Sequence, residues 1–107
     1  MMIINCTPHA INFNFNGNNT TFEPSGIIPR VSTIEVEAQE IAGFPCVTNI
    51  IGNVEGMPEK KPGTFLIVSG MVFGASNRPD LIAPDTGKTA VRNDKGHIIA
   101  VTRFLRK

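Results

Sequence analysis

The chain has 107 residues, of which 41% are apolar and 18% are charged, and its formal net charge is +1 at pH 7. This length predicts one domain spanning residues 1–107, because a single hydrophobic core typically occupies about 100–150 residues. A net charge so close to zero argues against a protein that binds long nucleic acids, since that affinity comes largely from neutralising phosphates. No apolar run approaches the roughly 20 residues of a membrane span, and the N-terminus lacks the features of a signal peptide.

Alternating and turn-forming residues predict strands and a hairpin in the first part of the chain. Residues 2–5 form a short β-like run, and residues 10–15 alternate between apolar and polar side chains. This period of two is typical of a half-buried strand. The sequence Asn-Gly-Asn-Asn at residues 16–19 predicts a tight turn, because Asn and Gly tolerate positive φ. Residues 20–23 then provide the returning strand.

The middle of the chain predicts two further strands and a loop. Residues 31–40 alternate and predict a strand with a polar outer face. Residues 45–51 are rich in β-branched side chains and predict another strand, which Gly52 and Asn53 would end. Residues 55–63 contain two prolines and mixed charges, and therefore predict a loop.

The last part of the chain predicts a buried strand, a short helix and a second hairpin. Residues 64–69 form an unbroken apolar run that favours a central strand. Residues 69–75 predict one or two helical turns, with Ser69 as the N-cap and Met71, Val72 and Ala75 facing inward. A short strand at residues 81–83, a turn at residues 84–87 and a hairpin at residues 91–101 follow.

These elements, about seven strands in all, predict an α+β fold that is mostly β. We expect small antiparallel or mixed sheets with hairpins and one or two short helices. Low charge and many strand edges also predict an oligomer, because unpaired edges favour association.

The sequence predicts no catalytic residues, no metal site and no cofactor. Cys6, His9, Cys46 and His97 are residue types that bind zinc, but only Cys6 and His9 are close in sequence. The triplet Gly-Lys-Thr at residues 87–89 resembles the end of a P-loop but lacks the glycine five residues before Gly87.

Arginines at the ends of the predicted elements are the better candidates for a functional site. The planar fork of arginine suits bidentate contacts with phosphate. Together with polar and aromatic neighbours they could hold a nucleotide; these candidates are Arg30, Phe73, Asn77, Arg78, Asp80, Asp85, Arg92 and Arg103. Composition alone favours the other interpretation, in which they are surface arginines with local ion pairs, beside a phenylalanine of the core.

Several segments occur in the same order in a known group of small phage proteins. They are IINCTPHAI at residues 3–11, GIIPRVS at 26–32, GTFLIVS at 63–69, RPDL at 78–81, PD at 84–85, VRNDKG at 91–96 and RF at 103–104. Through them the chain resembles the first type of phage anti-Thoeris sponge. That family sequesters cyclic ADP-ribose isomers made by bacterial TIR-domain enzymes.

The resemblance implies a non-catalytic homo-oligomer, up to a hexamer, in the cytoplasm of the infected bacterial host. It would bind its signals between subunits without degrading them, and some relatives also hold cyclic di- or trinucleotides. By family position, Arg30 and Arg103 would contact the ligand and Asp85 would be the polar residue after the Pro84 turn. The stacking position falls at Ala75, with Phe73 as the nearest ring.

Two other functions remain open from the sequence. One is an enzyme that cleaves cyclic nucleotides. The other is a phage protein-interaction module whose edge strands pair with a host protein.

Overall fold

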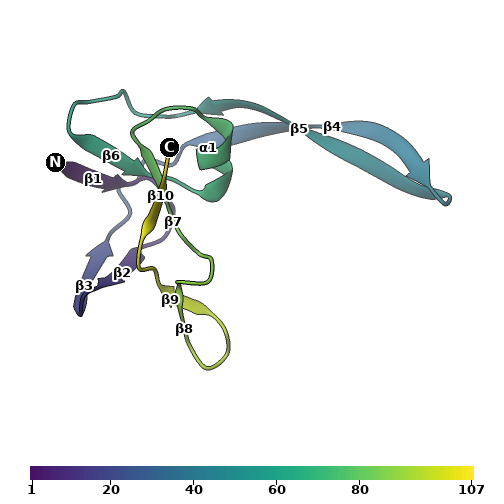
Figure 1. The fold of residues 1–107 in the computed structure, drawn as a ribbon. Coiled ribbons are helices and arrows are strands. Elements are labelled where there is room, and N and C mark those ends of the chain that lie inside the picture. The colour runs from purple at the N-terminus through teal and green to yellow at the C-terminus, as the bar shows by residue number, and fades with distance from the viewer.

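Strands make up most of the structure. The computed structural model describes residues 1–107 and contains ten strands and one helix (Figure 1). In chain order these are β1 (Met2–Asn5), β2 (Ile11–Phe15), β3 (Asn18–Phe22), β4 (Arg30–Ile41), β5 (Phe44–Glu55), β6 (Thr64–Ile67), α1 (Gly70–Ala75), β7 (Leu81–Pro84), β8 (Val91–Arg92), β9 (Ile98–Ala100) and β10 (Phe104–Arg106). The predicted α+β, mostly β class is therefore confirmed, with more strands than predicted. No helix has the length and apolar character needed to cross a membrane.

A four-stranded sheet lies at the centre, in the order β1-β6-β7-β10. Both β1 and β7 run parallel to β6, and β10 lies antiparallel to β7 at one edge. The predicted central strand is confirmed, because β6 lies between two neighbours and its Leu66 and Ile67 are buried. Burial of both faces explains why this strand is an unbroken apolar run.

The hydrophobic core is small and lies between this sheet and α1. Its five buried members are Cys6, Leu66, Val68, Val72 and Leu81. They come from the segment after β1, from β6 and the residue after it, from α1 and from β7. The core therefore ties together segments that are up to 75 positions apart, as Cys6 and Leu81 are.

Helix α1 begins where the sequence predicts. The Ser69 hydroxyl accepts a hydrogen bond from the Val72 backbone N–H at 3.3 Å, which makes Ser69 the N-cap. Val72 is buried, but Met71 is 59% exposed, so its predicted inward orientation is wrong. A helix of six residues has fewer than two turns, and Val72 is the one residue of α1 that is buried.

Strands β2 and β3 form the predicted hairpin. Its turn residues Asn16 and Gly17 have φ values of 52° and 77°, the left-handed conformation that a two-residue turn needs. The Phe13 ring packs against Phe104, with centroids 4.8 Å apart, and Phe22 meets the same ring at 5.9 Å. These aromatic contacts join the hairpin to the C-terminal strand β10.

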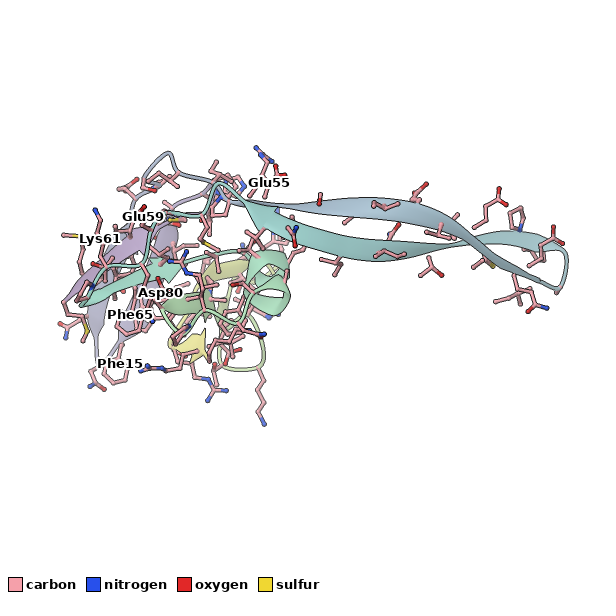
Figure 2. All side chains as sticks on the ribbon, turned by 90° about the horizontal axis from the view of Figure 1, so that it is seen from above. Phe15, Glu55, Glu59, Lys61, Phe65 and Asp80 are labelled. Atoms are coloured by element: carbon pink, nitrogen blue, oxygen red, sulfur yellow. The ribbon has the colours of Figure 1, made fainter.

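Strands β4 and β5 form a long hairpin, here called the arm, that extends away from the rest of the chain, here called the body (Figures 1 and 2). Residues Ala42 and Gly43 make the turn at its tip, with φ values of 51° and 83°. The radius of gyration is 16.8 Å, larger than the roughly 13 Å of a compact chain of about 100 residues. The arm accounts for this excess.

The end predicted for the second arm strand is wrong. Strand β5 continues through Gly52 and Asn53 to Glu55, and the register shifts between Val31 and Thr33 of the facing strand. A Cβ atom at Gly52 would clash with the Ser32 hydroxyl oxygen and lie 3.3 Å from the Ser32 carbonyl oxygen. The glycine therefore marks a close approach at a β-bulge rather than the end of a strand.

The predicted C-terminal hairpin is present as β8 and β9, while β10 is an additional strand. Residues 93–96 form the turn, where Asn93 Oδ1 accepts hydrogen bonds from the backbone N–H groups of Lys95 and His97. Strand β10 has only three residues and includes Arg106, so neither its length nor its pattern predicts a strand. Its pairing with β7 is decided by tertiary contacts.

Candidate functional site

A surface cleft at the base of the arm is the strongest candidate site, and we call it the base cleft. Its volume is about 330 Å³, within the roughly 300–1,000 Å³ of small-molecule sites. The lining comes from the segment after β1, from the start of β4 and from α1; it consists of Cys6, Pro8, Ile28, Pro29, Arg30, Val31, Ser69, Met71 and Val72. The base cleft is therefore mainly apolar with one cationic group.

Arg30 provides that cationic group. It is the first residue of β4, it is exposed, and it takes part in neither of the two ion pairs of the chain. The preceding residue Pro29 is buried and anchors the strand to the body. Glu55 lies directly opposite Arg30 in the ladder but forms no ion pair with it, so the guanidinium remains available to an anionic ligand.

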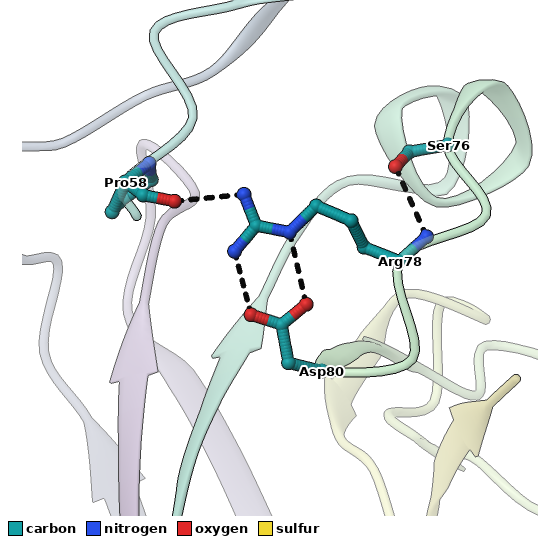
Figure 3. A network of polar contacts seen from close by, with 4 residues as sticks. All are labelled: Pro58, Ser76, Arg78 and Asp80. Atoms are coloured by element: carbon teal, nitrogen blue, oxygen red, sulfur yellow. Dashed lines mark hydrogen bonds and ion pairs between the residues drawn. The ribbon is translucent and has the colours of Figure 1, made fainter. Parts of the chain in front are cut away.

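Arg78, in contrast, is fully engaged within the protein (Figure 3). Its Nε and Nη2 atoms donate to the two carboxylate oxygens of Asp80 at 3.0 and 2.6 Å. Its Nη1 atom donates to the Pro58 carbonyl at 2.7 Å. All three guanidinium nitrogens therefore hold the loop before β6 against the start of β7.

The pairing with Arg78 shifts both pKa values. Hydrogen bonds from Arg78 lower the pKa of Asp80, and this effect outweighs the burial that would raise it. The same contact raises the pKa of Arg78. Asp80 is therefore a buried carboxylate kept ionised by a structural partner, an arrangement unlike that of a general base with a raised pKa.

The lowered pKa of Asp80 predicts a stability contribution that is lost in acid. The contribution is present above the unfolded-state pKa, near 4, and disappears as pH falls through the lower folded-state value. We expect wild type to be more stable than Asp80→Asn at pH 7 and the difference to shrink below about pH 4. Urea unfolding of both proteins at several pH values measures this difference. A constant gap across the range would contradict the assignment.

Asp85 and Arg103 are brought together although 18 positions separate them. The Arg103 Nε atom donates to Asp85 Oδ2 at 2.5 Å, and the Gly87 N–H donates to Oδ1 of the same carboxylate at 2.9 Å. These contacts lower the pKa of Asp85. The Arg103 side chain is 59% exposed, so its terminal amino groups still face solvent.

The remaining predicted site residues lie outside the base cleft. Arg92 donates to the Gly96 and Thr86 carbonyls at 2.7 and 3.5 Å, which closes the β8–β9 turn. Phe73 is half-buried, packs against the core and carries the Lys107 ammonium 4.1 Å from its ring centroid. Ala75 is half-buried at the end of α1, and Asn77 is exposed beyond it.

The predicted ligand residues therefore separate into distinct places. Arg30 lies at the base of the arm, Arg78 within a structural ion pair, and Arg103 with Asp85 beyond the end of β7. Arg30 and Arg103 do not line a common cleft. Sequence reasoning identified Arg30 but missed the apolar residues Ile28 and Met71 around it, which carry no chemical signature.

The motif at residues 3–11 forms a structural network centred on Asn5. The side-chain amide of this buried residue donates to the His9 and Phe22 carbonyls, both at 2.8 Å. Its Oδ1 accepts from the Thr7 N–H at 2.9 Å and from the Thr7 hydroxyl at 2.7 Å. Asn5 thus fixes the turn after β1 and ties it to β3.

Neither cysteine forms a disulfide, and no group of three or more His, Cys, Asp or Glu side chains is placed to hold a metal ion. Burial raises the pKa of the Cys6 thiol more than its polar neighbours lower it. The Cys6 side chain therefore lines the base cleft as a protonated thiol at neutral pH.

Comparison of the chain with protein-family models, with curated proteins and with solved structures gave no match.

Proposed function

We propose that this protein binds cyclic ADP-ribose-type signalling molecules and sequesters them without degrading them. Its place of action would be the cytoplasm of a phage-infected bacterium, where capture of the signal would suppress a TIR-dependent defence. The proposal combines the ordered motifs of the sequence with one structural observation: the unpaired Arg30 guanidinium at a cleft of ligand size.

The base cleft has a composition suited to part of such a ligand. A cyclic ADP-ribose isomer carries two linked phosphates and apolar ring faces. The Arg30 fork can donate two hydrogen bonds to phosphate oxygens, and charge-assisted bonds of this kind are roughly twice as strong as neutral ones. The apolar walls, which include Ile28 and Met71, suit the ring faces.

Arg103 is the second proposed phosphate contact. Asp85 orients it through Nε, which leaves the two terminal nitrogens directed to other partners. In this arrangement Asp85 positions the arginine, while its own two oxygens already have hydrogen-bond partners. Because Arg30 and Arg103 lie at different places on one chain, a ligand that touches both would lie between subunits, as in the resemblance. Cyclic di- or trinucleotides are proposed as additional ligands, because some members of the family that the sequence resembles hold them.

Arg30→Ala is expected to lower the affinity for a cyclic ADP-ribose isomer by at least tenfold, because it removes a charge-assisted hydrogen-bond pair. Isothermal titration calorimetry with wild type and variant measures the loss. Arg106→Ala is the matched control: it also removes an exposed guanidinium, which lies 5.4 Å from the Phe65 ring and outside the base cleft. Undiminished affinity in Arg30→Ala would contradict the proposed site.

A sponge and a cleaving enzyme differ in the chemical state of the ligand that is recovered after incubation. After incubation with the ligand and denaturation of the protein, chromatography should recover the ligand intact. Recovery of a hydrolysed product would favour the enzyme instead. A protein-interaction module would bind none of these ligands and would show no ligand-dependent rise in melting temperature, whereas a sponge is stabilised by RT ln(1 + [L]/Kd).

A further inference from the structure

The middle of the arm, between its two register shifts, has one face without any charged residue. Residues that lie directly opposite in an antiparallel pair point to the same side, and successive pairs alternate between the two sides. The register pairs Ile34 with Ile50, Val36 with Thr48, and Ala38 with Cys46. These six side chains form what we call the apolar face of the arm.

The opposite face is different in character. It carries the pairs Thr33 with Ile51, Glu35 with Asn49, and Glu37 with Val47. Two glutamates therefore lie on this face and none on the apolar face. The polar outer face predicted for residues 31–40 is present, but the inner, apolar face packs against nothing in the chain.

The apolar face is open to solvent. Ile34, Val36 and Ile50 are 62%, 44% and 51% exposed, and both strands extend beyond the body (Figure 2). A two-stranded hairpin alone in water is marginally stable, and a third strand or a packed face is normally needed. Extended apolar surfaces of this kind usually mark sites of protein association.

We propose that the apolar face of the arm packs against the same face of a second copy, with the two arms antiparallel about a twofold axis. Such an interface is self-complementary because the same patch is used twice. No like charges meet along the three central pairs, since these contribute no ionisable group other than the Cys46 thiol. The two ribbons would stack face to face about 10 Å apart, as sheets do in a sandwich.

The charge distribution favours the antiparallel arrangement. Residues 31–54 contain three glutamates and no basic residue, whereas the rest of the chain contains ten basic and six acidic residues, a net charge of +4. Antiparallel arms place each acidic arm near the basic body of the other copy. Parallel arms would bring the two bodies together at one end, where their like charges repel.

The size of the arm sets how far the contact must extend. Twelve residues per strand span about 40 Å, and two strands are about 10 Å wide, so one whole side of the arm offers a footprint of roughly 400 Å². A stable interface buries about 800 Å² per partner. The whole arm, tip included, therefore supplies about half of that area. The rest has to come from contacts between the tip, where Ile41 and Phe44 are 70% and 71% exposed, and the body of the second copy.

In the antiparallel arrangement each tip reaches the base of the other arm. The apolar tip then meets exposed Met71 and the mouth of the base cleft on the second copy. The partner would supply a phenylalanine ring beside Arg30, in a cleft that has no aromatic residue of its own. The arm contact itself is independent of the proposed ligand, because it concerns only how two chains associate.

Sedimentation-velocity centrifugation of the full chain over a range of concentrations tests the proposal. Wild type is expected to form dimers or larger even-numbered assemblies, and Ile34→Lys is expected to raise the dissociation constant at least tenfold. Ile51→Lys is the matched control, since Ile51 is 56% exposed on the opposite face one pair along the ladder. It should associate like wild type.

Two results would overturn the arm contact: a monomeric wild type at every concentration, or equal weakening by both substitutions. Circular dichroism and melting temperatures verify that both variants fold, and neither residue belongs to the core cluster. Hydrogen exchange gives a second readout, because arm amides should gain protection as wild-type concentration rises but not in Ile34→Lys. The ligand proposal fails separately, when Arg30→Ala binds normally.

Discussion

Replacing Arg78 with methionine is expected to lower the free energy of unfolding by about 3–5 kcal/mol, the usual cost of removing one partner from a buried ion pair. Asp80 is 5% exposed and would keep a carboxylate with no counter-charge. The Pro58 carbonyl would also lose its donor. Against the roughly 5–15 kcal/mol that stabilise a typical domain, this loss is large.

Urea unfolding followed by circular dichroism measures this loss. If Arg78→Met does not fold, Arg78→Lys provides the same test at smaller amplitude, because lysine keeps the charge but not the three-nitrogen geometry. Arg30→Met is the matched control, since it removes an exposed arginine that takes part in neither ion pair and should change stability little. Equal losses in the two methionine variants would contradict the structural role of Arg78.

Asn5→Ala is expected to destabilise the protein by about 2–4 kcal/mol, because each buried polar group left without a partner costs about 1–3 kcal/mol. The substitution removes the side-chain donor to the Phe22 carbonyl, one of two donors to the His9 carbonyl, and the acceptor for the Thr7 N–H and hydroxyl. The loss should appear as a lower urea midpoint, and the hairpin β2–β3 should show faster amide exchange.

Asn12→Ala is the control for this prediction. Asn12 also donates to a distant carbonyl, that of Ile99 at 3.3 Å, but the contact is exposed and water can replace it. Its removal should cost less than about 1 kcal/mol. A loss as large as that of Asn5→Ala would show that burial of the network is not what stabilises the turn.

The sequence predicted a strand, a helix cap or a turn correctly where a few neighbouring residues determine that feature. The apolar run of β6, the Ser69 cap and the Asn-Gly turn each depend on a few neighbouring residues. The short strand β10 depends on pairing with β7, and the turn at Ala42 requires an uncommon φ for alanine. Neither has a local pattern that would predict it.

The candidate site was only partly predictable for a related reason. Arginines were recognised as phosphate-binding residue types, but their partners decide what they do. Arg78 and Arg103 are paired with Asp80 and Asp85, whereas Arg30 has no ion-pair partner. The partner of Arg78 lies only two positions away in sequence, whereas Asp85 and Arg103 meet only because β10 lies beside β7.

The arm also divides the molecule into two parts that tolerate change differently. No residue between Ser32 and Asn53 belongs to the core cluster or packs against it; at the arm's base, Val31 and Val54 do. Substitutions, insertions or a proteolytic cut near the tip would therefore leave the central sheet intact. The body can keep its fold while the arm varies in length and sequence, so the folding of the body and the proposed arm contact depend on separate stretches of the same short chain.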